Sequence, residues 1–154
     1  MEWTRTFSEK QYEAALAGWR WLPIDGLAPQ FTSYFGDVFL SSPQGWWFLD
    51  TIEGDVKLCW PTREALELDL ATEDGQNRYL LAPLAEAAQR RGLSLGPDQV
   101  FDFMPPPVLG GSFDVANITV EDFVVSINIA GQLHQQLRDL PPGTPIGQIK
   151  IEGP

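Results

Sequence analysis

Nucleophilic chemistry in this chain would have to use Cys59 or His134, because the sequence contains one cysteine and one histidine. A Cys-His pair needs a thiolate beside an imidazole. Cys59 stands instead in an aromatic stretch that alternates like a strand, where a packed cysteine is far commoner. A Gly-x-Ser-x-Gly sequence is absent, and one histidine with one cysteine falls short of the usual zinc ligand set. The sequence therefore predicts no catalytic residues, no metal and no cofactor.

Paired carboxylates offer a second kind of chemistry, because two acids at a suitable separation can hydrolyse glycosidic bonds. The chain has 21 acidic residues among 154, so pairs arise by chance and a solvated acidic face is the simpler interpretation. The segment 50–55 resembles a calcium loop in composition alone, since it lacks the length and the final bidentate glutamate of an EF-hand. It is better interpreted as a hairpin turn.

Acidity is the strongest compositional feature of the chain, which has 10 basic residues and a formal charge of −11. Such a field repels the phosphates of nucleic acids and anionic membranes, and it attracts basic proteins. The apolar stretches are also too short to span a bilayer. We therefore expect a basic protein partner, no direct binding of nucleic acid and no membrane association. The alternative is that the charge only maintains solubility.

Two groups of acids are the candidates for a partner-binding surface. One group lies at 64–74, with Arg63 as its basic neighbour. The other lies between residues 92 and 137, a stretch that contains no lysine or arginine and also includes Asp102. Patches of one sign accelerate the encounter with an oppositely charged protein. The predicted partner-binding residues are Glu64, Glu67, Asp69, Glu73, Asp74, Asp98, Asp114, Glu121 and Asp122.

The elements that must position these side chains form one domain of the α+β class. Three short apolar runs separated by turn sequences predict an antiparallel meander over about 37–60. Apolar residues at helical spacing, together with capping residues, predict helices over about 8–20, 62–70, 73–91 and 120–138. We expect residues 1–30 to form an N-terminal helix and loop, and residues 31–151 to form the core of the domain.

For some segments the sequence pattern is compatible with more than one kind of secondary structure. Residues 99–103 predict a strand that ends at three consecutive prolines. The segment 119–140 has apolar residues at both strand and helix spacing, and its length and acidic start favour a helix. Ile146, Ile149 and Ile151 are compatible with a last edge strand. With a single cysteine, no internal disulfide can form, and no apolar run follows a basic segment at the start, so a cytoplasmic protein is expected.

Several short strings, taken in order, resemble the C-terminal domain of type VI secretion immunity proteins over roughly residues 30–151. They are YFGDVFL at 34–40, WFLDT at 47–51 with Gly54 in the turn, Asp74 with YLL at 79–81, PPVLGG at 106–111, NI at 117–118, DFVV at 122–125 and GQLHQQ at 131–136. The resemblance implies a cognate antidote that neutralises a secreted bacterial toxin, such as a nuclease delivered between bacteria. It brings no catalytic residues with it.

We therefore expect a binding protein that blocks a basic partner by occlusion. A first alternative is a small-molecule-binding or sensory domain, which a cavity ringed by Trp46, Trp47 and Trp60 would favour. A second alternative is an enzyme that uses scattered acids near His134, which would need two carboxylates with raised pKa values in a cleft.

Overall fold

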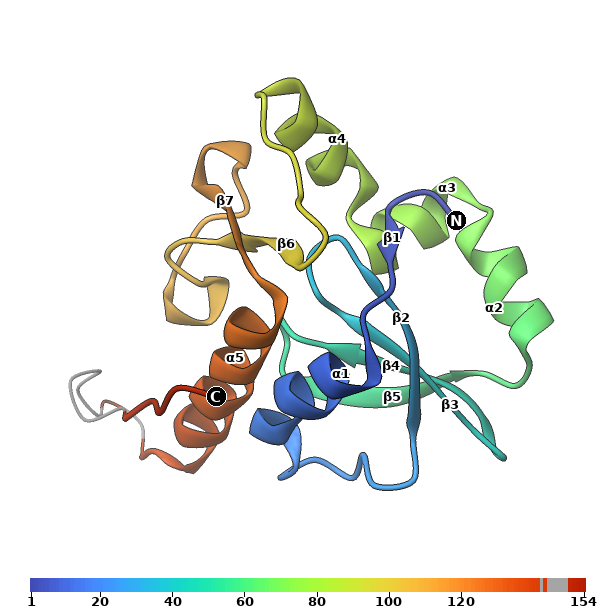
Figure 1. Cartoon of the computed structure of the whole chain (residues 1–154), viewed down its shortest axis with the longest axis horizontal. Coiled ribbons are helices and arrows are strands. Elements are labelled where there is room, and N and C mark those ends of the chain that lie inside the picture. Colours follow the sequence, from blue (N-terminus) through green and yellow to red (C-terminus); the bar gives the residue numbers. More distant parts are fainter. Residues whose placement is uncertain (142, 144–149) are drawn as a thin grey trace.

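The computed structural model describes residues 1–141, 143 and 150–154. Its main sheet is a five-stranded antiparallel meander (Figure 1). The strands follow one another in chain order: β1 (Thr4–Arg5), β2 (Ala28–Ser33), β3 (Val38–Ser42), β4 (Gly45–Asp50) and β5 (Asp55–Trp60). The α+β class and the meander predicted over 37–60 are confirmed. The sheet also includes β2 and β1, which the sequence did not predict.

A smaller sheet pairs β6 (Gln99–Phe103) with β7 (Ile118–Asp122) in antiparallel register. The chain passes from β7 directly into α5 (Phe123–Asp139), so the ambiguous segment is a strand followed by a helix. The helix begins three residues later than predicted because the residues before it pair with β6. Asp122 then caps the helix by accepting a hydrogen bond from the backbone N–H of Val125 at 3.0 Å.

The first helix agrees with its prediction. Ser8 and Gln11 form the expected capping box at the start of α1 (Glu9–Leu16), and a 3₁₀ turn continues the helix through Trp19. The helix α2 (Arg63–Leu70) is likewise confirmed, with Thr62 as its N-cap.

The single helix predicted over 73–91 is wrong. The segment forms α3 (Glu73–Gly75), a π-helical turn over Gln76–Leu80, and α4 (Ala82–Arg90). Leu81 separates them with a φ of +49°, and Pro83 follows in the first turn of α4. Proline has no N–H to donate, so it favours the start of a new helix over the continuation of an old one.

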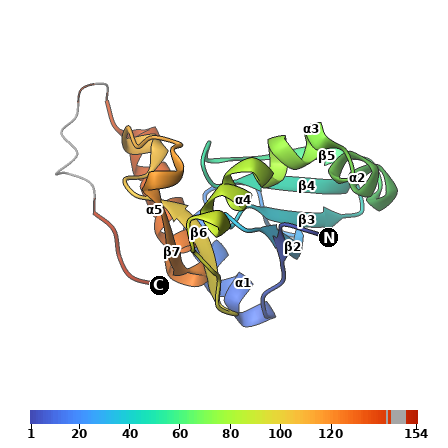
Figure 2. The same cartoon turned by 90° about the horizontal axis from the view of Figure 1, so that it is seen from above.

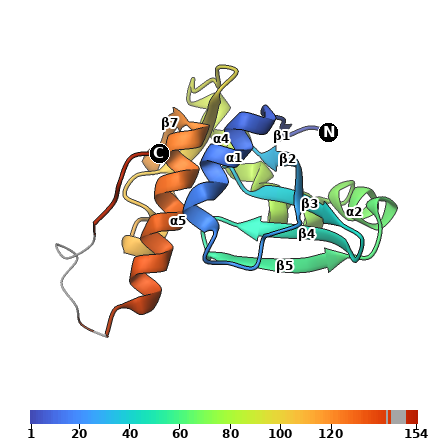
Figure 3. The same cartoon turned by 60° about the horizontal axis from the view of Figure 1, so that its bottom comes forward.

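Alternation along the central strands sends apolar side chains to both faces of the main sheet, and helices cover each face. Val38, Leu40 and Leu49 pack against α1 and α5, whereas Phe39, Phe48 and Trp60 pack against α2 and the π-helical turn. Figures 2 and 3 show α1 and α5 side by side on their face of the sheet, with α2 at the far end. A third cluster joins the smaller sheet to α4.

Candidate partner-binding surfaces

The acids at 64–74 form an exposed patch on α2 and α3. Glu64, Glu67, Glu73 and Asp74 are all exposed, and the helices that carry them are fixed by Thr62 and by Thr72, the N-cap of α3. The guanidinium of Arg63 donates to Glu67 at 2.8 Å, an exposed pair that leaves the other acids uncompensated. We call Glu64, Glu67, Glu73 and Asp74 the helix patch.

Asp69, the fifth acid of this group, has a structural role. Its side chain is half-buried and accepts a hydrogen bond from the indole Nε1 of Trp60 at 2.8 Å. Trp60 is itself buried and packs against Phe39 and Tyr79. Asp69 therefore holds α2 on the sheet, and the environment of Trp60 is packed core. That finding counts against a ligand cavity ringed by Trp46, Trp47 and Trp60, which would have favoured a small-molecule-binding domain.

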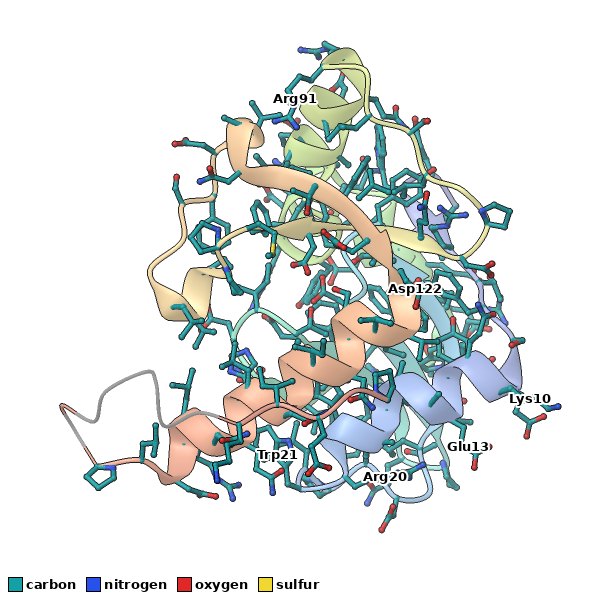
Figure 4. The ribbon with its side chains drawn as sticks, turned by 60° about the vertical axis from the view of Figure 1, so that its left-hand side comes forward. Lys10, Glu13, Arg20, Trp21, Arg91 and Asp122 are labelled. Atoms are coloured by element: carbon teal, nitrogen blue, oxygen red, sulfur yellow. The ribbon has the colours of Figure 1, made fainter. Side chains whose placement is uncertain are left out.

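The second group of acids lies on and around the smaller sheet. Asp98 accepts a hydrogen bond from Gln11 Nε2 at 2.8 Å, and Glu121 accepts one from Thr119 at 3.1 Å. Asp122 caps α5, and Figure 4 shows it at the junction of β7 and α5. Asp114 is exposed at the start of a 3₁₀ turn before β7. Each of these acids is at the surface or at its edge.

The two groups do not form one surface. Viewed from three directions about the horizontal axis, α2 and α3 stay at one end of the long axis, and β7 and α5 stay at the other (Figures 1, 2 and 3). The second group is also approached by cations from distant parts of the sequence. Arg5 donates to the carbonyl of Gln99, and Arg91 donates to the carbonyls of Val115 and Ile118. The helix patch, by contrast, contains one direct ion pair, between Arg63 and Glu67, and its remaining acids are exposed.

Between β6, the loop 104–109 and α5 lies an apolar pocket of about 410 Å³. Phe101, Phe103 and Leu133 form much of its wall, and Met104 and Val125 are half-exposed at its rim. Four polar side chains also line it: Thr51, Asp102, Glu121 and Ser126. We call this cavity the β6–α5 pocket. The sequence contains no direct signal for this pocket beyond the run of prolines at 105–107, which predicts the end of a strand.

The carboxylate of Asp102 is held in place at the wall of the pocket. Ser126 Oγ donates to its Oδ2 at 2.8 Å, and the backbone N–H of Phe103 donates to its Oδ1 at 2.8 Å. Burial raises the pKa of Asp102; these two hydrogen bonds oppose that effect, and nearby Glu121 adds to it. The pocket thus combines a large apolar surface with a partly desolvated negative group.

A second buried carboxylate, Asp37, belongs to the fold of the sheet. Its Oδ1 accepts hydrogen bonds from the backbone N–H and the hydroxyl of Thr51, and its Oδ2 accepts one from Ser33. These bonds tie the end of β2 and the start of β3 to the turn after β4. Burial, reinforced by the nearby charge of Asp50, raises the pKa of Asp37 to about 7.

His134 and Cys59 are both engaged in structural contacts. His134 is buried on α5, and its Nε2 lies 3.0 Å from the carbonyl oxygen of Thr51. Gly54 lies so close to this ring that a Cβ there would be 2.4 Å from His134 Nδ1. Cys59 is half-buried on β5, and burial raises the pKa of its thiol. A higher thiol pKa reduces the thiolate fraction, so the environment does not activate this cysteine.

The part of the chain that the structure describes contains neither a candidate metal site nor a membrane-spanning helix. No group of three or more His, Cys, Asp or Glu side chains there is arranged to hold a metal ion. Within the same residues, no helix combines the length and the apolar character needed to cross a bilayer.

Comparison with known proteins gives a family match and a likeness to solved structures. Residues 62–134 match the family model described as the type VI secretion system immunity protein Tdi1, C-terminal. The structure resembles that of Atu4351 from Agrobacterium tumefaciens, with a TM-score of 0.58 and 15% sequence identity. This likeness covers 84% of the present chain and 66% of the other, which is just under two thirds of its length, and at this identity it shows the fold alone. No curated protein matches the chain.

Proposed function

We propose that this chain, whose residues 62–134 match the type VI secretion immunity family model, neutralises a cognate secreted toxin by covering the toxin's working surface. The observation that carries the proposal is that the helix patch lies inside the matched segment. Glu64, Glu67, Glu73 and Asp74 are exposed there on a protein of formal charge −11. The division of the chain into residues 1–30 and a family-like core at 31–151 stays a prediction.

A nuclease is the class of toxin that this charge fits best. An enzyme that holds a phosphate backbone needs a basic surface, and an acidic protein can cover that surface by charge complementarity. The same charge disfavours direct binding of nucleic acid by the immunity protein itself. Such a toxin acts where the nucleic acid is, so the proposal places this protein in the cytoplasm.

The proposal treats the protein as a binder without catalysis of its own. Occlusion needs no nucleophile, and the residues best suited to that role have structural duties: His134 contacts the carbonyl of Thr51, and Asp102 is tied to Ser126. The alternative of a small-molecule-binding domain now rests on the β6–α5 pocket. Its apolar wall and few polar groups are typical of ligand sites of about 300–1,000 Å³.

The proposal is tested by reversing the helix patch. In a variant with Glu64, Glu67, Glu73 and Asp74 all replaced by lysine, we expect association with the toxin encoded beside this gene to slow about 10- to 100-fold at low salt, because electrostatic steering is reversed. Stopped-flow mixing or biolayer interferometry at several salt concentrations would measure the rate. Inhibition of the toxin should weaken in parallel.

A matched control reverses four exposed acids elsewhere: Glu2, Glu9, Glu13 and Asp25. It changes the net charge equally but leaves α2 and α3 intact. If both variants slow association by the same factor, the acidity acts through net charge and the helix patch is not the contact surface. If the unmodified protein neither binds nor inhibits the toxin, the immunity function itself is refuted.

A further inference from the structure

The β6–α5 pocket has one charged feature, and its sign is negative. Asp102 and Glu121 line it, and no lysine or arginine is among its lining residues. None of the ion pairs formed within residues 1–141, 143 and 150–154 involves either carboxylate. A ligand that fills the pocket and carries a positive charge beside its apolar part would therefore match both the wall and the two acids.

The chain's own C-terminal segment shows how an extended peptide can lie beside this pocket. The side-chain amides of Gln132 and Gln136, one turn apart on α5, each exchange hydrogen bonds with the backbone of the segment at Glu152 and Lys150 respectively. The two N–H donors of the segment lie 2.7 Å from the glutamine oxygens. The glutamines thus act as a short strand edge, to which a backbone can add.

Ile151, the residue between these two anchored positions, lines the pocket, and its side chain remains 41% exposed. Ile151 therefore lies at the mouth of the pocket and leaves part of the apolar pocket wall uncovered. Lys150 precedes Ile151, so the segment itself combines an apolar residue with a neighbouring cation. Held by two half-buried glutamine side chains and by Ile151 at the pocket, it can be exchanged for another extended segment at small cost.

We propose that the β6–α5 pocket binds an apolar side chain from an extended segment of the toxin, with an adjacent Lys or Arg reaching Asp102 and Glu121, in the place that Ile151 holds in the free protein. The inference rests on the proposed immunity function and gives it a second contact besides the helix patch. Burial of the acids strengthens the interaction, because charges attract more strongly where water is excluded. An apolar anchor in a desolvated pocket is also where interfaces concentrate their binding energy.

The test neutralises the two acids without changing their shape. For Asp102→Asn combined with Glu121→Gln, we expect the dissociation constant for the toxin to rise about 10- to 100-fold, mainly through faster dissociation. The control, Glu2→Gln combined with Glu13→Gln, removes the same charge from exposed positions outside the pocket and should change the constant less than about threefold. If the double variant is poorly folded by circular dichroism, Val125→Lys supplies a cation at the rim and should weaken binding similarly.

The tail provides an independent readout. Ile151→Ser should tighten toxin binding about two- to fivefold, because less has to be displaced. Unchanged binding by the Asp102/Glu121 and Val125 variants, with the helix-patch reversal still effective, would overturn the pocket proposal and leave the immunity function standing. A small molecule retained in the protein under native mass spectrometry, and lost in Val125→Lys, would assign the pocket to a different occupant. Failure of the unmodified protein to bind the toxin would overturn both proposals.

Discussion

Replacing Gly18 with valine is expected to lower the free energy of unfolding by about 3 kcal/mol, the upper end of the usual cost of overpacking, because the added bulk meets backbone. Gly18 lies in the 3₁₀ turn that continues α1, where that segment crosses α5. A Cβ at this position would lie 2.2 Å from the backbone oxygen of Asn128. Because the obstacle is backbone, no side chain can turn aside to make room.

The contact between α1 and α5 is equally tight on the α5 side. At Gly131, on the facing side of α5, a Cβ would lie 2.4 Å from the carbonyl oxygen of Gly18. Two indoles lock the same contact: Trp19 Nε1 donates to the carbonyl of Ile127 at 2.7 Å, and Trp21 Nε1 donates to those of Gly18 and Gly131 at 3.0 Å. Separating the helices by even 1 Å would weaken these bonds along with the packing.

Urea or guanidinium unfolding followed by tryptophan fluorescence would measure the effect as a lower midpoint at unchanged slope. Gly153→Ala is the matched control, because a Cβ there meets nothing within 4 Å, and it should change the stability by less than about 0.5 kcal/mol. A Gly18→Val protein as stable as the control would mean that α1 is not packed on α5 in solution.

The sequence predicted best where local chemistry and burial agree. The central meander is specified by apolar alternation between turn residues, and its strands lie where the pattern indicated, with Val38 and Leu40 facing one helical layer and Phe39 the other. The capping box at Ser8 begins α1 as expected, and Gly92, which has a φ of +97°, directly follows the C-cap of α4. In each case the signal lies within a few residues of the element that it specifies.

The errors have a different cause, which is pairing with distant parts of the chain. Nothing local reveals that residues 118–122 pair with β6, so the helix predicted from residue 120 began too early. The helical spacing of apolar residues continues through Leu81, so a single helix was predicted over 73–91. The positive φ of Leu81 cannot be recognised from an apolar pattern. The first half of β2, residues 28–30, falls in the predicted N-terminal loop, because Pro29 is typical of loops and rare inside sheets.

The candidate site shows the same division. Exposed acids can be recognised from the sequence, but their grouping depends on the fold, which puts the helix patch and the acids near β7 at opposite ends of the molecule. The fold also places Asp69 where it accepts a hydrogen bond from Trp60, and it places Arg91 against the carbonyls of Val115 and Ile118. The β6–α5 pocket draws on segments from Phe35 to Ile151, so no window of sequence contains it.

Stability should fall as the pH rises from 5 to 8, and Asp37 should account for much of the loss. The pKa of Asp37 is raised from 3.8 to about 7 by burial and by nearby Asp50, and that of Asp50 is raised as well, chiefly by burial. A carboxyl whose pKa is raised in the folded state holds a proton that the unfolded chain has already released. Its penalty is therefore absent below about pH 4, grows up to about pH 7 and is constant above it.

The pH interval from 5 to 7 covers about two units of the difference between the folded and unfolded pKa values of Asp37. Because one pKa unit corresponds to about 1.4 kcal/mol, Asp37 lowers the free energy of unfolding by at most about 3 kcal/mol over this interval. Asp37→Asn should flatten the pH dependence, because an amide keeps an acceptor for Thr51 and does not ionise. It should be less stable than the unmodified protein at pH 5, where Ser33 loses a well-placed acceptor, and the difference should shrink or reverse by pH 8. Urea unfolding at pH 5, 6, 7 and 8 would measure both slopes.

The general acidity of the chain also favours lower pH, since like charges repel less as carboxylates take up protons. Glu13→Gln separates that contribution from the effect of Asp37, because it removes one negative charge from an exposed position on α1. It should leave the slope almost as steep as in the unmodified protein. Equal flattening by Glu13→Gln and Asp37→Asn would show that the slope reports net charge, and would exclude a buried, protonated carboxyl that joins β2, β3 and the turn after β4.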